Sequence, residues 1–418
     1  MRTAILSPVS TPASPIRLHP PRSRHRIVTP SLRVASSATA VVFGAARARG
    51  PIGRDDIARA TGLSAATVNR QVAALLEAEL LRERADLAAA GAIGRPRIPV
   101  EVNHEPYLTL GIHIGVRATS IVATDLRGRA LDTVEIPTPH GDQRAALAAV
   151  AASARRYLSR WRRRRTLAVG VTIGGSVDSA AGYVDHPRLG WTQAPVGPVL
   201  AEALGLPVSV ATHVDAMAAA ELLLGQRAAP SESDTRLYVY ARDTVGYALV
   251  IGGRVHSPAG GPGTIATLPV TSELLGGNGT LASTVIDEAV LAAARRAGVT
   301  LPAAAGPGAV LAPLLAAARA GDDTATSLLQ ERARVLGRAI GLLSDLLNPD
   351  ELIVGGQAFT DYPEGLAALA EAYAGRGAPG PREIRVSAFG ARVQEAGAGI
   401  VSLGALYTDP LRALRRVG

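Results

Sequence analysis

The side chains best suited to recognise another molecule gather between positions 64 and 71. They are Ser64, Thr67, Asn69, Arg70 and Gln71. Arginine, asparagine and glutamine form hydrogen bonds to base edges in the major groove of DNA, and serine and threonine contact bases or phosphates. Apolar residues recur between these positions at helical spacing, so the polar side chains are predicted to occupy the outer faces of one helix. The pattern predicts a helix that reads DNA.

Three predicted helices would position that surface. They span residues 36–49, 54–61 and 65–78. Gly50-Pro51 ends the first helix, Gly62 supplies a tight turn, and Ser64 suits the N-cap of the third helix. A short helix, a glycine-containing turn and a longer helix have the spacing of a helix-turn-helix motif, whose second helix enters the major groove.

A strand hairpin is predicted to follow the third helix. Residues 79–82 and 98–102 have strand character, and Gly94-Arg95-Pro96-Arg97 lies between them. Arginines on a stiff hairpin reach into a narrow minor groove or hold phosphates. Arg95 and Arg97 are therefore predicted DNA contacts, the alternative being that they only cap the hairpin. The winged helix-turn-helix domain is predicted to span residues 31–104.

The distribution of charge along the chain indicates which classes of function the protein could have. The net charge is +9, and +7 of it lies in residues 1–105. A localised positive field is typical of a polyanion binder, although a solvated basic tail would also produce it. Residues 1–30 are rich in proline, serine and arginine, which predicts a disordered basic arm.

Composition also sets expectations for location and cofactors. No run of about 18 apolar residues occurs, so no membrane span is predicted, and a cytoplasmic location is expected. The chain has no cysteine, which rules out disulfides and thiolate metal sites.

From residue 107 onward, strands alternate with helices. Predicted strands at 108–114, 119–125, 130–136 and 167–173, with a helix at 144–160, form one half, and a second half begins at Arg236. This order predicts an α/β fold of the actin-like (RNase H-like) type over residues 107–414. Its two lobes are expected at about 107–230 and 235–414, with a ligand crevice between them.

Motifs along the whole chain together resemble the ROK family, named for repressor, open reading frame and kinase. They include G-P-I-G-R-D-D-I-A-R-A-T-G-L-S at 50–64, G-R-P at 94–96, L-G-I-H-I-G at 110–115, L-G-W at 189–191 and L-N-P-D-E-L-I-V-G-G at 347–356. The resemblance covers roughly residues 31–414. It implies a winged helix-turn-helix domain joined to a two-lobed ATPase or sugar-kinase fold.

The first two kinase motifs of that family are altered here. Where the family has D-x-G-x-T, whose aspartate helps to hold Mg²⁺, this chain has His113. A neutral imidazole is a poor ligand for Mg²⁺. Where the family has E-N-D-A-N, this chain reads Ala-Thr-His-Val-Asp at 211–215. His213 therefore stands in place of the family's general base, and Thr212 in place of its sugar-binding asparagine.

The third motif and the zinc loop are also altered. G-E-I-G-H, whose glutamate and histidine hold sugar hydroxyls in the family, is replaced by residues 263–267, with Thr264 and Thr267 at those two positions. Many relatives carry a cysteine-rich zinc loop next, whereas residues 274–280 here contain no thiol. No zinc, other metal or cofactor is expected.

These observations predict a transcriptional regulator, a repressor rather than an enzyme, that binds an operator in double-stranded DNA as a homodimer. The kinase-like domain is expected to mediate dimerisation and to sense a small-molecule effector, which need not be a sugar. The residues expected to line the effector cleft are His113, Thr212, His213, Thr264 and Thr267. Two alternatives stay open: a sugar kinase with a DNA-binding appendage, and a DNA-binding protein that responds to no ligand.

Overall fold

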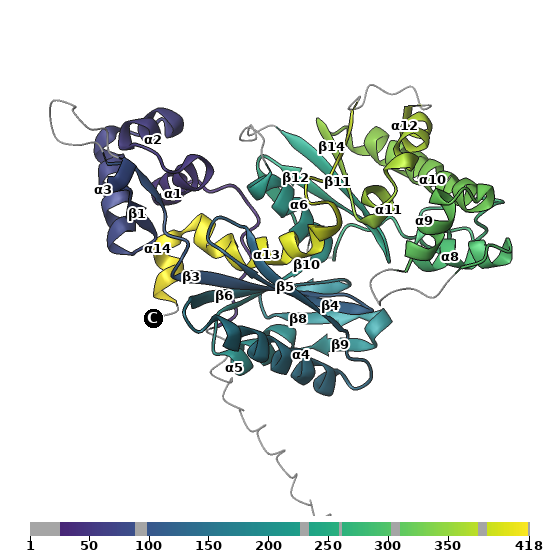
Figure 1. Cartoon of the computed structure of the whole chain (residues 1–418), viewed down its shortest axis with the longest axis horizontal. Coiled ribbons are helices and arrows are strands. Elements are labelled where there is room, and N and C mark those ends of the chain that lie inside the picture. Colours follow the sequence, from purple (N-terminus) through teal and green to yellow (C-terminus); the bar gives the residue numbers. More distant parts are fainter. Residues whose placement is uncertain are drawn as a thin grey trace, which may run out of the picture.

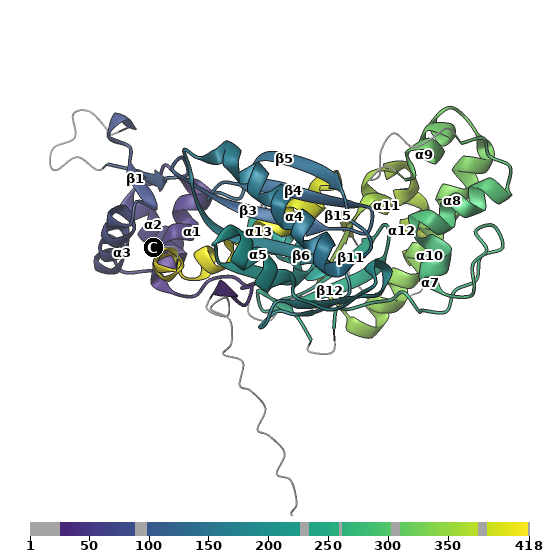
Figure 2. The same ribbon diagram turned by 90° about the horizontal axis from the view of Figure 1, so that it is seen from below.

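A helical head and two sheet-containing lobes lie in a row (Figures 1 and 2). The computed structural model describes residues 26–87, 98–225, 234–258, 261–301, 310–374 and 383–416. No helix in these ranges is long and apolar enough to cross a membrane.

The head contains the predicted helix-turn-helix. Its elements are α1 (Ala38–Arg49), α2 (Arg54–Thr61), α3 (Ala65–Glu77), β1 (Leu81–Glu83) and β2 (Val100–Val102). Phe43, Ile57 and Val72 are fully buried where the three helices meet. The first strand begins later than predicted because Glu79 has a φ of 56° and the N–H of Leu80 still bonds to the helix carbonyl of Leu75.

The first lobe is built on a five-stranded sheet. Its strands are β3 (Tyr107–Ile114), β4 (Ala118–Thr124), β5 (Ala130–Pro137), β6 (Arg165–Ile173) and β10 (Val208–Thr212), in the order β10-β6-β3-β4-β5. Helices α4 (Gln143–Leu158) and α5 (Val196–Leu204) cover one face of this sheet (Figure 1). A small antiparallel sheet, β7 (Ser176–Asp178), β8 (Tyr183–His186) and β9 (Trp191–Ala194), adjoins it.

The second lobe repeats this plan, as the sequence predicted. Its strands are β11 (Thr235–Ala241), β12 (Val245–Ile251), β13 (Arg254–His256), β14 (Glu351–Gly355) and β15 (Ile384–Val386), in the order β13-β12-β11-β14-β15. Its helices are α7 (Leu281–Val285), α8 (Asp287–Arg296), α9 (Ala312–Arg319), α10 (Asp323–Leu347), α11 (Gln357–Thr360) and α12 (Leu366–Ala374). In both sheets, three antiparallel strands precede two parallel ones in chain order.

Two helices cross between the lobes, and the predicted lobe boundaries are corrected accordingly. α13 (Val393–Thr408) returns to the first sheet, where Gly111 and Gly170 leave no room for a side chain beneath its backbone. α6 (His213–Leu224) packs instead on the second sheet, and its buried Glu221 accepts hydrogen bonds from Ser387 and Arg385. The final helix, α14 (Pro410–Arg415), lies between α13 and the head (Figure 1).

The predicted disordered arm needs a second correction. Residues 26–30 are ordered in part by backbone pairing, because Ile27 forms a parallel bridge with Val208 of β10. Residues 1–25 lie outside the described ranges.

Candidate functional site

The predicted DNA-contacting side chains lie on the N-terminal half of α3. Ser64 caps this helix, and its hydroxyl accepts a hydrogen bond from the N–H of Thr67 at 3.2 Å. Gly62 ends α2 with a φ of 69°, which favours glycine in the tight turn. Asn69 and Arg70 are exposed. Gln71 points differently, because its side-chain oxygen accepts a hydrogen bond from Thr39 of α1. Ser64 is exposed as well, but its hydroxyl is engaged in the helix cap. Asn69 and Arg70 are therefore the exposed side chains of this set that remain to enter a groove.

The wing consists of β1 and β2, paired antiparallel from Leu81 opposite Val102 to Glu83 opposite Val100. Ile52, between α1 and α2, adds a bridge to Val100. The predicted contacts Arg95 and Arg97 lie outside the described residues, so their role as DNA contacts stays a prediction.

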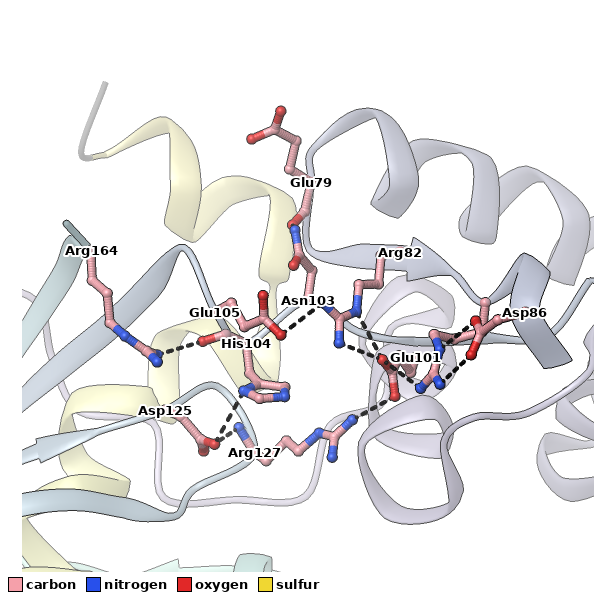
Figure 3. A network of polar contacts seen from close by, with 11 residues as sticks. Glu79, Arg82, Asp86, Glu101, Asn103, His104, Glu105, Asp125, Arg127 and Arg164 are labelled. Atoms are coloured by element: carbon pink, nitrogen blue, oxygen red, sulfur yellow. Dashed lines mark hydrogen bonds and ion pairs between the residues drawn. The ribbon is translucent and has the colours of Figure 1, made fainter.

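A polar network joins the base of the wing to the first lobe (Figure 3). Glu101 of β2 is buried, with a side chain only 4% exposed, and forms ion pairs with Arg82, Arg84 and Arg127 at 2.8 to 3.1 Å. Arg127 belongs to the β4–β5 turn of the first lobe, whereas both other arginines belong to the head. Burial opposes the ionisation of Glu101, but the hydrogen bonds from Arg82 and Arg84 outweigh it and keep its pKa below the ordinary value.

The second site is a cleft of about 580 Å³ between the lobes. Of the residues predicted to line it, His113, Thr212, His213 and Thr264 do so. Thr267 is exposed and is not among the lining residues, so its predicted place in the cleft is wrong. Lining residues that sequence reasoning missed include His186, Arg188, Tyr240, Arg242 and Gln394. The family motif L-G-W begins three residues after His186 and is the sequence feature that lies close to it.

Three histidines and a tyrosine gather at the base of the cleft. The ring centroids of His113 and His213 lie 5.9 Å apart, and those of His213 and Tyr240 lie 5.4 Å apart. Burial lowers the pKa of His113 well below its ordinary value and that of His213 to about 4. Burial likewise lowers the pKa of His186. All three imidazoles are therefore neutral at physiological pH.

Hydrogen bonds fix what two of these imidazoles present to a ligand. His186 Nδ1 accepts from the N–H of Leu189 at 3.2 Å, so the proton of the neutral ring is on Nε2, which faces Gly174 at the edge of the cleft. His113 Nδ1 shares a hydrogen bond with Thr172 at 3.1 Å. A neutral, buried imidazole so held does not fit the role of the Mg²⁺-binding carboxylate of a sugar kinase. In the described part of the chain, no group of three or more His, Asp or Glu residues is arranged to hold a metal ion.

An ion-pair latch spans the mouth of the cleft. Glu288 of α8, in the second lobe, pairs with Arg117 and with Arg188 of the first lobe, the latter at 3.3 Å. Arg188 also donates to the backbone oxygen of Asp243 at 2.7 Å, which is again a contact between lobes. These side chains are about one-third to one-half exposed, so each pair contributes roughly 0–1 kcal/mol. Such a latch holds the lobes together and is weak enough to open.

The buried imidazole of His213 makes stability depend on pH. The unfolded chain binds a proton near pH 6.5 that the native ring does not take up until about pH 4, so stability falls as pH is lowered through this window. We expect the chain to lose roughly 1.5 kcal/mol more than a His213→Gln variant between pH 6.5 and 5. Urea titrations of both chains at the two pH values measure the difference. Equal losses would show that His213 is not buried in its neutral form.

A winged helix-turn-helix head on a two-lobed, actin-like domain defines the class of this protein. The family described as ROK family matches residues 109–403. A transcriptional regulator of Mycobacterium tuberculosis (strain ATCC 25618 / H37Rv) is 67% identical over 410 residues, which cover 97% of this chain and 93% of that protein. The chain therefore belongs to the ROK family.

More distant relatives and solved structures also match this chain. The DNA-binding transcriptional dual regulator NagC of Escherichia coli (strain K12) is 24% identical over 323 residues, 74% of this chain and 77% of that protein. A crystal structure of a ROK family transcriptional regulator, a homologue of the E. coli Mlc protein, matches with a TM-score of 0.72 at 24% identity, over 91% of this chain and 98% of that one. A ROK glucokinase from Streptomyces griseus matches with a TM-score of 0.59 at 22% identity, over 71% and 99%. These two structures share the fold.

Proposed function

We propose that this protein is a sequence-specific, DNA-binding transcriptional regulator that represses its target genes. The observation that carries the proposal is a capped α3 that exposes Asn69 and Arg70 from a helix-turn-helix head. The positive charge concentrated in residues 1–105 supports it, because it attracts phosphates. The names of the relatives, as transcriptional regulators, agree with it.

The kinase-like domain, on this proposal, serves regulation in the cytoplasm rather than phosphate transfer. The resemblance to the family's motifs places His113 and His213 where its kinases carry carboxylates, and burial lowers the pKa of both imidazoles, which keeps them neutral. A second cavity, which includes Gln357 just after the motif ending in Gly356, is lined by the carboxylates Glu135, Asp287, Asp361 and Glu395 and by the guanidinium groups of Arg242 and Arg332. The protein is expected to show no transfer of phosphate from ATP to hexoses; measurable transfer would favour the kinase alternative.

A homodimer on a two-fold operator is the proposed assembly, with effector binding in the cleft shifting the balance between lobe arrangements. The cleft offers neutral imidazoles and hydroxyls in place of the sugar anchors, so hexoses are not assumed to be the effector. A thermal-shift screen of small molecules, with hexoses and hexose phosphates as one group of compounds, tests whether an effector binds in the cleft. If no small molecule shifts the melting temperature, the result would favour the alternative of a DNA-binding protein that responds to no ligand.

Arginine variants test the DNA-binding proposal directly. Arg70→Ala is expected to reduce affinity for the operator by roughly 5- to 150-fold and to relax the preference for one base pair, because an arginine at a base edge carries about 1–3 kcal/mol of discrimination. Arg95→Ala is expected to weaken binding to all sequences more evenly and to reduce its salt dependence. Both are measured by fluorescence anisotropy on operator and scrambled duplexes.

The matched control is Arg319→Ala, which removes a positive charge from α9 in the second lobe, far along the molecule from the head. It should leave operator affinity within about twofold, since screening removes long-range effects at physiological salt. If the parent chain bound operator and scrambled DNA equally and weakly, the proposed function would be wrong.

A further inference from the structure

The segment before the head pairs with the edge of the first lobe. Ile27 forms a parallel bridge with Val208, and the N–H of Val28 donates to the backbone oxygen of Val208 at 2.9 Å. Val208 begins β10, which is the edge strand of the first sheet. Ile27 also packs against Gly197 of α5.

The same segment then pairs with the edge of the second lobe. The N–H of Val255 donates to the oxygen of Leu32 at 2.9 Å, and the N–H of Val34 donates to the oxygen of Gly253 at 2.8 Å. These bonds place Arg33 opposite Arg254 of β13, the edge strand of the second sheet. Between the two pairings, Ser31 lies on α13, where the hydroxyl of Thr408 bonds to it at 2.7 Å. Residues 26–34, here called the strap, are therefore hydrogen bonded to both lobes.

The strap leads into the first helix of the head within three residues. Val34 is the last residue bonded to β13, and Ser37 is the N-cap of α1. Three residues of chain span at most about 10 Å, so the start of α1 cannot move far from β13 unless these hydrogen bonds break.

α1 also rests on both crossing helices. The guanidinium of Arg47 donates to the backbone oxygen of Leu223, near the end of α6, and lies 4.6 Å from the ring centroid of Tyr407 on α13. Phe43 packs against the same tyrosine, with ring centroids 6.3 Å apart. At their other ends both helices begin in the cleft: His213 opens α6, and Gln394 of α13 bonds to Tyr240 and Arg242.

We propose that the strap transmits the relative position of the two lobes to the head. The inference rests on the proposed function, in which lobe closure changes DNA binding. When the lobes move apart, β10 and β13 move apart, and a strap bonded to both must pull on α1 or release one edge. A change in the cleft thereby reaches the recognition helix, because α3 is packed directly on α1.

A cycle of two changes tests the strap. Glu288→Ala removes both ion pairs of the latch between the lobes. A Gly-Ser-Gly-Ser insertion after Ala35 slackens the connection to α1 without touching the strap's hydrogen bonds. The same insertion after Gly141, in the exposed turn before α4, is the matched control. The natural chain has no cysteine, so spin labels can be placed cleanly. Arg59→Cys with Arg156→Cys reports the distance from head to first lobe, and Arg156→Cys with Arg319→Cys reports the distance between lobes.

The expected result is that Glu288→Ala shifts or broadens both distances, and that the insertion after Ala35 reduces the head shift while the control insertion preserves it. An equal head shift with and without the insertion would overturn the proposal. So would lobes that stay fixed when the latch is cut, because the strap would then have no motion to transmit. Operator binding by the unlabelled chains is measured separately. Specific operator binding without a head shift would contradict only the proposal that the strap transmits lobe position. A parent chain that does not bind the operator specifically would contradict the proposed function.

Discussion

Replacement of Glu101 with alanine is expected to lower the free energy of unfolding of the head by about 2–3 kcal/mol and to loosen its attachment to the first lobe. Removal of one partner from a buried ion pair lowers the free energy of unfolding by about 3–5 kcal/mol, because the remaining buried charge has no counterion. The lower value applies here because the three arginines around Glu101 are 17% to 35% exposed and water can partly solvate them. Arg127, the least exposed of them, would lose its ion pair with the head.

Urea unfolding followed by circular dichroism measures the stability change, and limited proteolysis of the 103–106 connection measures the loosening. The matched control is Glu105→Gln. The carboxylate of Glu105 also pairs with Arg82, but its side chain is 62% exposed. That control should cost less than about 1 kcal/mol, since surface ion pairs contribute little. If the two variants behaved alike, the network at Glu101 would be a surface cluster with no part in holding the head.

The helix-turn-helix was predictable because its signals are local. Gly62 and Ser64 set a turn and a cap within three residues of each other, and α2 spans the predicted residues. The cleft was predictable only in part, through motif positions such as His113 and His213. His186, Tyr240 and Gln394 come from three other elements, and only the folded chain brings them to the same place.

The strap and the crossing of α13 were not predictable from local pattern. A Pro-, Ser- and Arg-rich segment has the composition of a disordered arm, yet Val28 pairs with a residue 180 positions away through backbone groups that every sequence carries. Likewise, Gly111 and Gly170 are informative only once α13 is known to lie against them. Long-range backbone pairing depends on which edges are left open, and those edges exist only in the folded sheets.

The largest single loss of stability is expected in the second lobe, from Asp287→Ala. Asp287 of α8 pairs with Arg332 of α10 at 2.5 Å, and both side chains are only 4% exposed. Arg332 also donates to the backbone oxygen of Val285 at 2.7 Å, so the guanidinium ties α7, α8 and α10 together. Without the carboxylate, a buried positive charge remains unpaired, which costs about 3–5 kcal/mol.

A double variant separates this penalty from the net worth of the pair. Asp287→Leu with Arg332→Met removes both charges and fills similar volume, so it should recover most of the loss and end within about 1–2 kcal/mol of the parent chain. The control is Glu331→Gln. Glu331 lies on the same helix but forms ion pairs with the more exposed Arg334 and Arg338, so its replacement should cost less than about 1 kcal/mol. Urea unfolding of the four chains gives the comparison. A double variant as unstable as Asp287→Ala would mean that the pair specifies the packing of α8 on α10 and cannot be replaced by apolar contacts.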